Sequence, residues 1–143
     1  MAVFMKGDMW SVFGLVDHFV ITTNSTIKKN GAVVMGAGIA KQVRDKWPGI
    51  DVEIGNAING VDTYGLILGS DIGVFQVKHF WGDDADVRLI KYSTMELAMH
   101  AVANPDRTYA LNFPGIGNGG LPYEVVKPIV DVLPDNVQVW TFN

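Results

Sequence analysis

The sequence predicts a three-layer α/β/α sandwich with a mixed central sheet. Short apolar and β-branched segments alternate along the chain with segments of helical periodicity, and helical crossovers connect parallel strands. One pair of apolar runs is separated only by Gly69–Ser70–Asp71, which is typical of a β-hairpin and adds an antiparallel strand. The sheet is therefore expected to be mixed.

The composition is that of one globular domain. The chain has 143 residues, of which 48% are hydrophobic, enough for one core and too few for two ordinary domains. Residues 1–143 are therefore expected to form a single domain, and we expect a monomer. The net charge of −4 opposes long-range attraction to nucleic acid or anionic membrane, so no extended nucleic-acid surface and no membrane partner are expected.

Several kinds of chemistry are excluded or disfavoured by residue type. The chain has no cysteine, which excludes disulfides, thiol catalysis and thiolate metal sites. His18, His79 and His100 show no ligand spacing, so neither a metal nor a cofactor is expected. Residues 1–10 lack a long apolar run and carry Lys6 and Asp8; they resemble neither a signal peptide nor a membrane span, and a cytoplasmic location is expected.

The first half of the chain predicts two strands, a helix and two loops. The β-branched and apolar segments Val3–Lys6 and Asp17–Thr23 predict strands, and Thr26–Gly31 predicts a polar loop. Apolar residues at helical spacing predict a helix over Ile39–Trp47. We expect Gly49–Asp62 to be a small loop, and its sequence leaves open whether it closes over a ligand.

The second half continues the alternation of strands and helices. The expected strands are Tyr64–Leu68 and Ile72–Val77, which form the hairpin, followed by Thr108–Phe113 and Val137–Phe142. The expected helices are Val87–Val102 and Tyr123–Leu133, and Pro128 should kink the second of them.

Two glycine-rich stretches, Gly36–Gly38 and Gly115–Gly120, lie between a predicted strand and the start of a predicted helix. Free backbone N–H groups and the helix dipole favour a phosphate at such a place, and glycine lets the backbone approach phosphate oxygens closely. Two such loops at one edge of a sheet could hold a diphosphate. The alternative interpretation is that both are simply tight turns.

Two other nucleotide motifs fit less well. Gly115–Gly120 matches the GxGxxG dinucleotide fingerprint, but that fingerprint belongs early in a Rossmann unit and needs a further strand and an acidic residue about 20 positions on. Here it lies close to the end of the chain, which argues against an NAD-dependent dehydrogenase. No GxxxxGK[ST] string occurs, so a P-loop hydrolase is not supported.

Four motifs in order along the chain resemble the signature of the macrodomain family. They are GD at Gly7–Asp8, TTN at Thr22–Asn24, VMGAGIA at Val34–Ala40 and PGIGNGGLPYEVVKPI at Pro114–Ile129. The first glycine loop is most similar to the branch that contains terminal ADP-ribose protein glycohydrolase, the yeast-type ADP-ribose 1″-phosphate phosphatase and the antitoxin that removes ADP-ribose from DNA. The resemblance implies a macrodomain-like fold and a cleft for ADP-ribose or an ADP-ribosylated substrate.

The resemblance also implies roles for individual residues. Asp8 would bond the adenine amino group beside the backbone of Met9, and Asn24 would contact the distal ribose. Phe142 would pack on the adenine, although a core position for Phe142 and a stacking role for Trp140 stay open. The backbone of the two loops would hold the distal ribose and the diphosphate, through Met35, Gly36, Ala37, Gly38 and Ile39 in the first loop and Gly115, Ile116, Gly117, Asn118 and Gly119 in the second.

The segment FQVKHFW at Phe75–Trp81 resembles the segment around the catalytic lysine of the glycohydrolase and antitoxin members. Lys78 is therefore the candidate nucleophile, with Asn24 as a second catalytic candidate, because a lysine amine can attack an anomeric carbon and open the sugar as a Schiff base. A solvated lysine at a strand end is the plainer interpretation. Gly119 stands where the glycohydrolase carries an acidic partner, and Asp83, Asp84, Asp86 and Glu124 are more simply solvated.

The function implied is hydrolysis of an ADP-ribosyl derivative, on protein or nucleic acid. Two alternatives stay open. The first is an ADP-ribose 1″-phosphate phosphatase in which Asn24 or His79 helps to position water. The second is a non-catalytic reader that only captures ADP-ribose.

Overall fold

The computed structural model describes residues 1–59, 65–68 and 72–142, which contain a six-stranded sheet with helices on both sides. The strands are β1 (Val3–Lys6), β2 (His18–Thr23), β3 (Leu66–Leu68), β4 (Ile72–Gln76), β5 (Tyr109–Asn112) and β6 (Val137–Thr141). The helices are α1 (Gly38–Lys46), α2 (Ile50–Asn59), α3 (Val87–Ala103) and α4 (Tyr123–Val130), with short 3-10 turns η1 (Met9–Val12) and η2 (Gly117–Gly119).

The sheet is mixed, as the sequence predicts. Its strand order is β1-β6-β5-β2-β4-β3. All neighbouring strands run parallel except β3 and β4, which are antiparallel. The predicted turn of this hairpin at 69–71 lies outside the described residues. The parallel pairs follow from the helical connections between successive strands.

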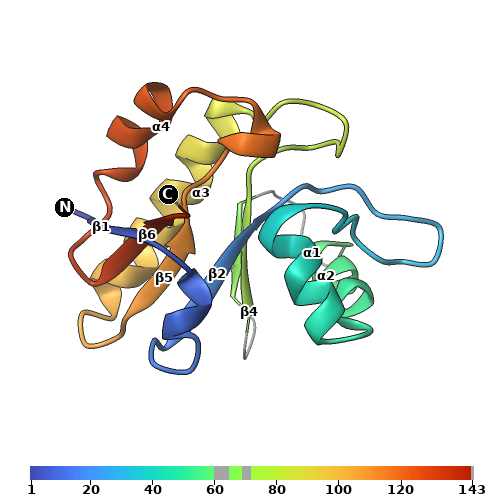
Figure 1. Cartoon of the computed structure of the whole chain (residues 1–143), viewed down its shortest axis with the longest axis horizontal. Helices are drawn as coiled ribbons and strands as arrows, with labels where there is room; N and C mark the ends of the chain where they lie inside the picture. Colours follow the sequence, from blue (N-terminus) through green and yellow to red (C-terminus); the bar gives the residue numbers. More distant parts are fainter. Residues whose placement is uncertain (60–64, 69–71, 143) are drawn as a thin grey trace.

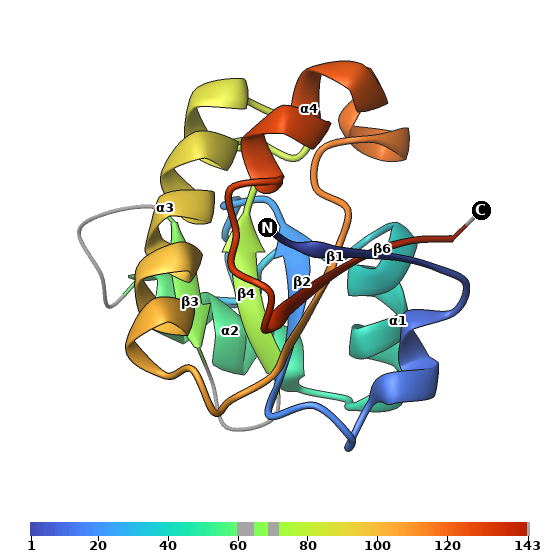
Figure 2. The same ribbon diagram turned by 90° about the vertical axis from the view of Figure 1, so that its left-hand side faces the viewer.

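Helices cover both faces of the sheet and give the expected three layers. Figure 1 shows α3 and α4 on one side and α1 and α2 on the other, and Figure 2 looks onto the side of α3 and α4. Each face has its own core. In β2, Phe19 and Ile21 pack with α1 and α2, whereas Val20 between them packs with α3 and α4, because successive side chains of a strand point to opposite faces.

Two sequence expectations need correction. The segment Gly49–Asp62 is not a small loop, because residues 50–59 form α2; residues 60–62 lie outside the described part. Ile50, Ile54 and Ile58 recur every four residues and place one apolar stripe on the core, with Ile54 and Ile58 buried. The last helix ends at Val130, two residues after Pro128 and three before its predicted end.

The carboxyl ends of β2, β4 and β5 lie at one edge of the sheet, because these strands are parallel neighbours. The chain segments that leave them are 24–37, 77–86 and 113–122; in Figure 1 the last two lie at the top and the first runs out to the right. Ligands of open α/β sheets bind at this edge. Within the described residues, no helix is long and apolar enough to cross a membrane.

Candidate functional site

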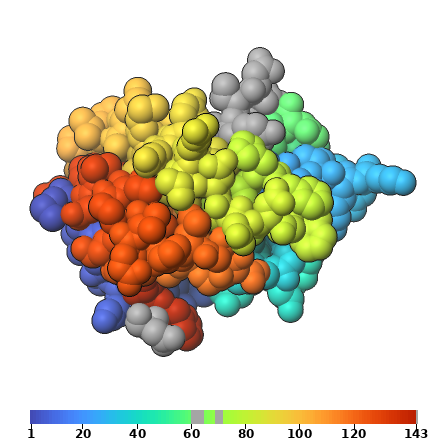
Figure 3. Space-filling view, turned by 90° about the horizontal axis from the view of Figure 1, so that it is seen from above, coloured from blue at the N-terminus to red at the C-terminus, as the bar shows by residue number. Residues whose placement is uncertain are grey.

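A cleft of about 760 Å³ opens at this edge of the sheet, a size typical of small-molecule sites. Figure 3 looks down on the edge, where the second glycine loop (orange), residues 78–86 (yellow-green) and residues 25–33 (light blue) share one face. Most of the predicted site residues line the cleft: Asn24, Met35, Gly36, Ala37, Gly38, Ile39, Lys78, Gly115, Ile116, Gly117, Asn118 and Gly119. The fold thus brings the two glycine loops together.

The first loop delivers the N-terminus of α1 to the cleft. Ala37 occupies the N-cap position with extended backbone and makes no side-chain capping bond. The first backbone N–H groups of α1 therefore have no intrahelical acceptor and no side-chain cap. Since Gly38 and Ile39 line the cleft, these donors and the positive end of the helix dipole are available to an anion.

The second loop is held in one shape by tight contacts. Gly115, Gly117 and Gly120 all have positive φ, at 77°, 63° and 73°. A Cβ on Gly115 would lie 2.6 Å from the Cδ1 atom of Ile90, so this position cannot take a side chain without a shift in the core. The Leu121 N–H donates to the Gly115 carbonyl over 3.0 Å. These contacts and this hydrogen bond define the shape of the loop.

Gly119 packs closely against Ala85, in the segment that follows β4. A Cβ there would lie 3.0 Å from the Cβ of Ala85, and the Ala85 N–H donates to the Gly119 carbonyl over 2.8 Å. A side chain at position 119 would therefore require the segment after β4 to shift by a few tenths of an ångström.

Asn24 holds the first loop through its own side chain. Its Nδ2 donates to the Val34 carbonyl over 2.9 Å, and its Oδ1 accepts from the Thr26 N–H over 3.0 Å. Both ends of the amide are thus engaged within the loop, so Asn24 shapes the wall of the cleft.

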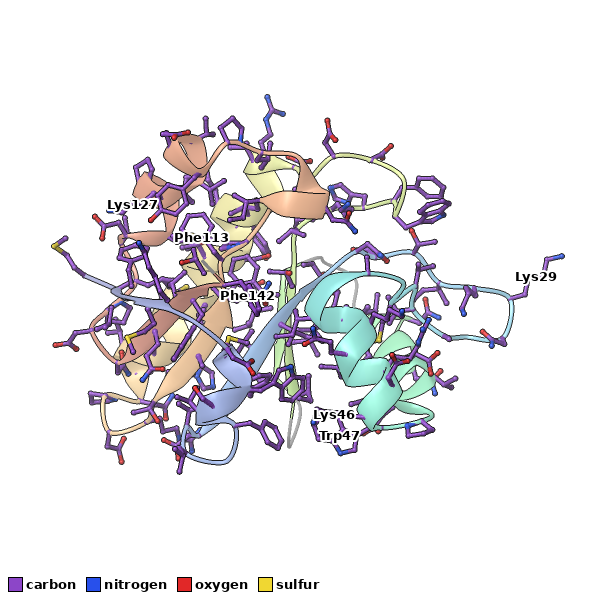
Figure 4. All side chains as sticks on the ribbon, viewed as in Figure 1. Lys29, Lys46, Trp47, Phe113, Lys127 and Phe142 are labelled. Atoms are coloured by element: carbon purple, nitrogen blue, oxygen red, sulfur yellow. The ribbon has the colours of Figure 1, made fainter. Side chains whose placement is uncertain are left out.

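Lys78 lines the cleft directly after β4 and is partly buried. Its backbone is fixed by a short chain of hydrogen bonds: the buried Gln76 donates from Nε2 to the Ser25 hydroxyl over 2.9 Å, and that hydroxyl donates to the Lys78 carbonyl over 3.1 Å. Lys28 also lines the cleft, whereas Lys29 extends from the tip of its loop, away from the body of the protein (Figure 4).

The residues expected at the adenine lie outside this cleft. Met9 is buried, and Asp8 caps η1 by accepting from the Trp10 N–H over 3.0 Å. Phe142 is 79% exposed, so it is not a core aromatic. Trp140 is only 7% exposed and packs in the core, which leaves Phe142 as the accessible ring of the two.

Sequence reasoning missed part of the lining, namely Thr22, Thr23, Thr26, Lys28, Val34, Ala40, Val77, Trp81, Asn112 and Phe113. Asn112 and Thr22 form a reciprocal pair: the Thr22 N–H donates to Asn112 Oδ1 over 2.9 Å, and Asn112 Nδ2 donates to the Thr22 hydroxyl over 2.8 Å. A polar residue ending an apolar strand just before the second glycine loop is the signal that could have identified Asn112.

No carboxylate and no histidine occurs among the described residues that line the cleft. Asp86 caps α3 by accepting from the Arg88 N–H over 2.8 Å, and it pairs with His79 over 3.5 Å. Asp83 and Asp84 are exposed, as expected. Within residues 1–59, 65–68 and 72–142, no three His, Asp or Glu side chains are grouped so that they could hold a metal.

Asp17, His18 and Tyr109, whose pKa values are shifted, lie at the opposite edge of the sheet, where β2 and β5 begin. The His18 ring stacks on Tyr109 with centroids 4.8 Å apart and contacts His100 at 5.4 Å, and Arg107 Nη1 lies 3.5 Å from His18 Nε2. Burial lowers the pKa of His18, and the His100 and Arg107 charges add to this, while Asp17 opposes it. Burial also raises the pKa of Tyr109.

This cluster predicts a pH dependence of stability. Because the pKa of folded His18 lies below its ordinary 6.5, the unfolded chain binds the proton more readily, and stability falls as pH drops from above 6.5 through the folded pKa. His18→Gln should therefore lose less stability than wild type between about pH 8 and pH 5, measured by urea unfolding. Equal losses for the two proteins would contradict the prediction.

No protein-family model matches the sequence, and a search of curated proteins also gives no match. The structure nevertheless resembles solved macrodomains. The macrodomain of Mycobacterium tuberculosis DarG has a TM-score of 0.78 and 20% identity, with 100% of this chain and 99% of that chain covered. The macrodomain of Thermus aquaticus DarG has a TM-score of 0.71 and 23% identity, with 100% and 98% covered.

A third structure, of Thermosipho africanus DarTG in complex with ADP-ribose, has a TM-score of 0.75 and 19% identity, with 96% of this chain and 41% of that chain covered. At such identities the likeness is one of fold. The chain thus has the macrodomain fold that its motifs imply, with the two glycine loops at the carboxyl edge of the sheet.

Proposed function

We propose that the cleft binds ADP-ribose and that the protein hydrolyses an ADP-ribosyl derivative. The observation that carries the proposal is the pairing of two glycine loops, one of them opening an uncapped helix N-terminus, around one cleft. Such donors suit a diphosphate without any requirement for a positively charged surface. The ADP-ribose bound to the similar Thermosipho africanus protein supports the same ligand.

The proposed reaction uses Lys78. The unprotonated Nζ attacks the anomeric carbon of the distal ribose, the bond from that carbon to the acceptor oxygen or nitrogen breaks, and the acceptor leaves with a proton. Opening of the ring gives a Schiff base with Lys78, and water then releases ADP-ribose and restores the amine. The lining offers no carboxylate as a proton carrier, so water or the acceptor itself would have to transfer protons.

The same lack of a carboxylate favours a second candidate, a reader that binds ADP-ribose and does not hydrolyse it. The phosphatase has less support, because Asn24 is engaged at both ends of its amide and His79, which does not line the cleft, pairs with Asp86. Incubation with ADP-ribosylated protein, ADP-ribosylated DNA and ADP-ribose 1″-phosphate separates the three functions. A hydrolase releases ADP-ribose from the modified protein or DNA, a phosphatase releases phosphate from ADP-ribose 1″-phosphate, and a reader turns over none of the three substrates.

The binding step is tested by calorimetry with ADP-ribose, and Gly36 offers a way to block the cleft. Gly36 is exposed in the cleft wall, has ordinary φ, and has open space where a Cβ would stand. Gly36→Val should leave the melting temperature within about 2 °C of wild type, since ordinary surface changes cost little. It should weaken ADP-ribose binding by at least about tenfold, since it fills space next to the loop donors.

Gly36→Ala is the graded control and should lose less affinity than Gly36→Val. Absence of measurable binding by the wild-type protein would reject the proposed ligand. Unchanged binding by Gly36→Val would instead show that ADP-ribose occupies another site.

A further inference from the structure

The carboxyl end of β2 and the residues after it form a run of polar side chains, Thr22 to Thr26. Thr22 bonds Asn112, Asn24 bonds the first loop, Ser25 bonds Gln76 and the Lys78 carbonyl, and the Thr26 hydroxyl accepts from the Trp81 N–H over 2.9 Å. Thr23 alone in this run differs. Its Oγ1 atom is buried and has no hydrogen-bond partner among the described residues.

Thr23 is 4% exposed and also lines the cleft. Its backbone is fully occupied by the sheet: it pairs with Gln76 of β4, and its carbonyl accepts from the Val77 N–H over 2.9 Å. Side chains alternate along β2, so Thr23 shares the face of Phe19 and Ile21, which is the face covered by α1. The backbone of Thr23 is thus held in the sheet beside the cleft.

A buried hydroxyl without a partner is costly, because it has lost its bonds to water and gained none in exchange. The two other buried atoms without a partner among the described residues, on Thr94 and Asp131, belong to residues that do not line this cleft. Of these three, Thr23 is therefore the one whose residue lines the cleft.

We propose that the Thr23 hydroxyl is a ligand-recognition group that bonds a hydroxyl of the distal pentose of ADP-ribose. This inference rests on the proposed function. A threonine hydroxyl both donates and accepts, which matches an alcohol, whereas the loop N–H groups only donate and match the phosphates. Asn24 and Lys78, the residues tied to the distal ribose by resemblance, line the same cleft. Thr23 would then favour ADP-ribose over ADP, which lacks that pentose.

The test is Thr23→Val, which replaces the hydroxyl by a methyl group of nearly the same size. We expect ADP-ribose affinity to fall by about tenfold, the effect of one buried hydrogen bond, with ADP affinity unchanged and a melting temperature that does not fall. Thr23→Ser, which keeps the hydroxyl, should bind ADP-ribose within about threefold of wild type. Thr94→Val is the matched control: it removes an equally unpartnered hydroxyl from α3 and should leave binding unchanged.

The outcomes separate this inference from the proposed function. If the wild-type protein binds no ADP-ribose, the proposed function fails. If the wild-type protein binds it and Thr23→Val binds equally well, the inference alone is overturned. Equal losses for ADP and ADP-ribose would overturn the assignment to the distal pentose. Should Thr23→Val not fold, Thr23→Ala removes the same hydroxyl and is judged by the same three results.

Discussion

Lys78→Ala should lose at least about 10³-fold in the rate of release of ADP-ribose from a modified substrate, the scale on which loss of a nucleophile acts. Lys78→Arg should be equally inactive, because it keeps the positive charge but presents no unprotonated amine. Both variants should still bind free ADP-ribose, because the loop backbone supplies the donors for the diphosphate.

Lys28 provides the matched comparison, because it is an exposed lysine that lines the same cleft. Lys28→Ala should raise KM and leave kcat nearly unchanged, since its charge only attracts the substrate. The measurements are single-turnover release of ADP-ribose for the Lys78 variants and steady-state kinetics for Lys28→Ala, on each substrate class. A Lys78→Ala protein as active as wild type on every substrate would reject the lysine mechanism.

Gly55→Ala should destabilise the protein by about 3 kcal/mol, the upper end of the cost of overpacking a core. A Cβ on this buried residue of α2 would lie 1.9 Å from the Gly31 carbonyl oxygen and 3.0 Å from the Val33 nitrogen. Both contacts are with backbone, so no side-chain rotation can relieve them. The helix would separate from the 28–33 segment and strain the Val33 N–H bond to the Asp51 carbonyl, now 3.0 Å long.

The consequence should extend to the cleft. Val34, whose carbonyl holds Asn24, directly follows that segment, so ADP-ribose affinity should fall together with stability. Thermal unfolding and urea titration measure the stability loss. Gly36→Ala, which meets open space, should change stability by less than about 0.5 kcal/mol. A Gly55→Ala protein that melts within about 2 °C of wild type would mean that α2 does not pack as described.

Most of the elements could be predicted from local patterns. The strand Val3–Lys6 is predicted with its observed bounds, and the helix Val87–Val102 differs by one residue at its end, because both patterns are regular. The helix α2 was missed because glycines flank Ile50–Asn59 and suggest a loop, although Ile50, Ile54 and Ile58 recur at helical spacing. The burial of α2 in the core on the α1 side of the sheet outweighs the weak local signal.

The candidate site was predictable where it is made of backbone. Glycine between a strand and a helix has a direct structural meaning, and both loops do line one cleft. The roles of Asp8 and Phe142 stay predictions, because these residues lie outside that cleft. Side-chain roles were harder, because sequence does not show which polar atoms are already bonded. Asn24 and Thr23 are adjacent, yet the Asn24 amide makes one hydrogen bond from each end, whereas the Thr23 hydroxyl has no partner among the described residues.

The sequence by itself determined the class of fold, the order of the strands and of every α-helix except α2, and the two loops, because periodicity and glycine placement act over a few residues. The tertiary structure decided which residues meet. It placed Lys78 and Asn112 beside loops distant in the chain, packed Gly119 against Ala85, and left the Thr23 hydroxyl without a partner among the described residues. Such contacts depend on how parallel strands are ordered in the sheet, which no local pattern specifies.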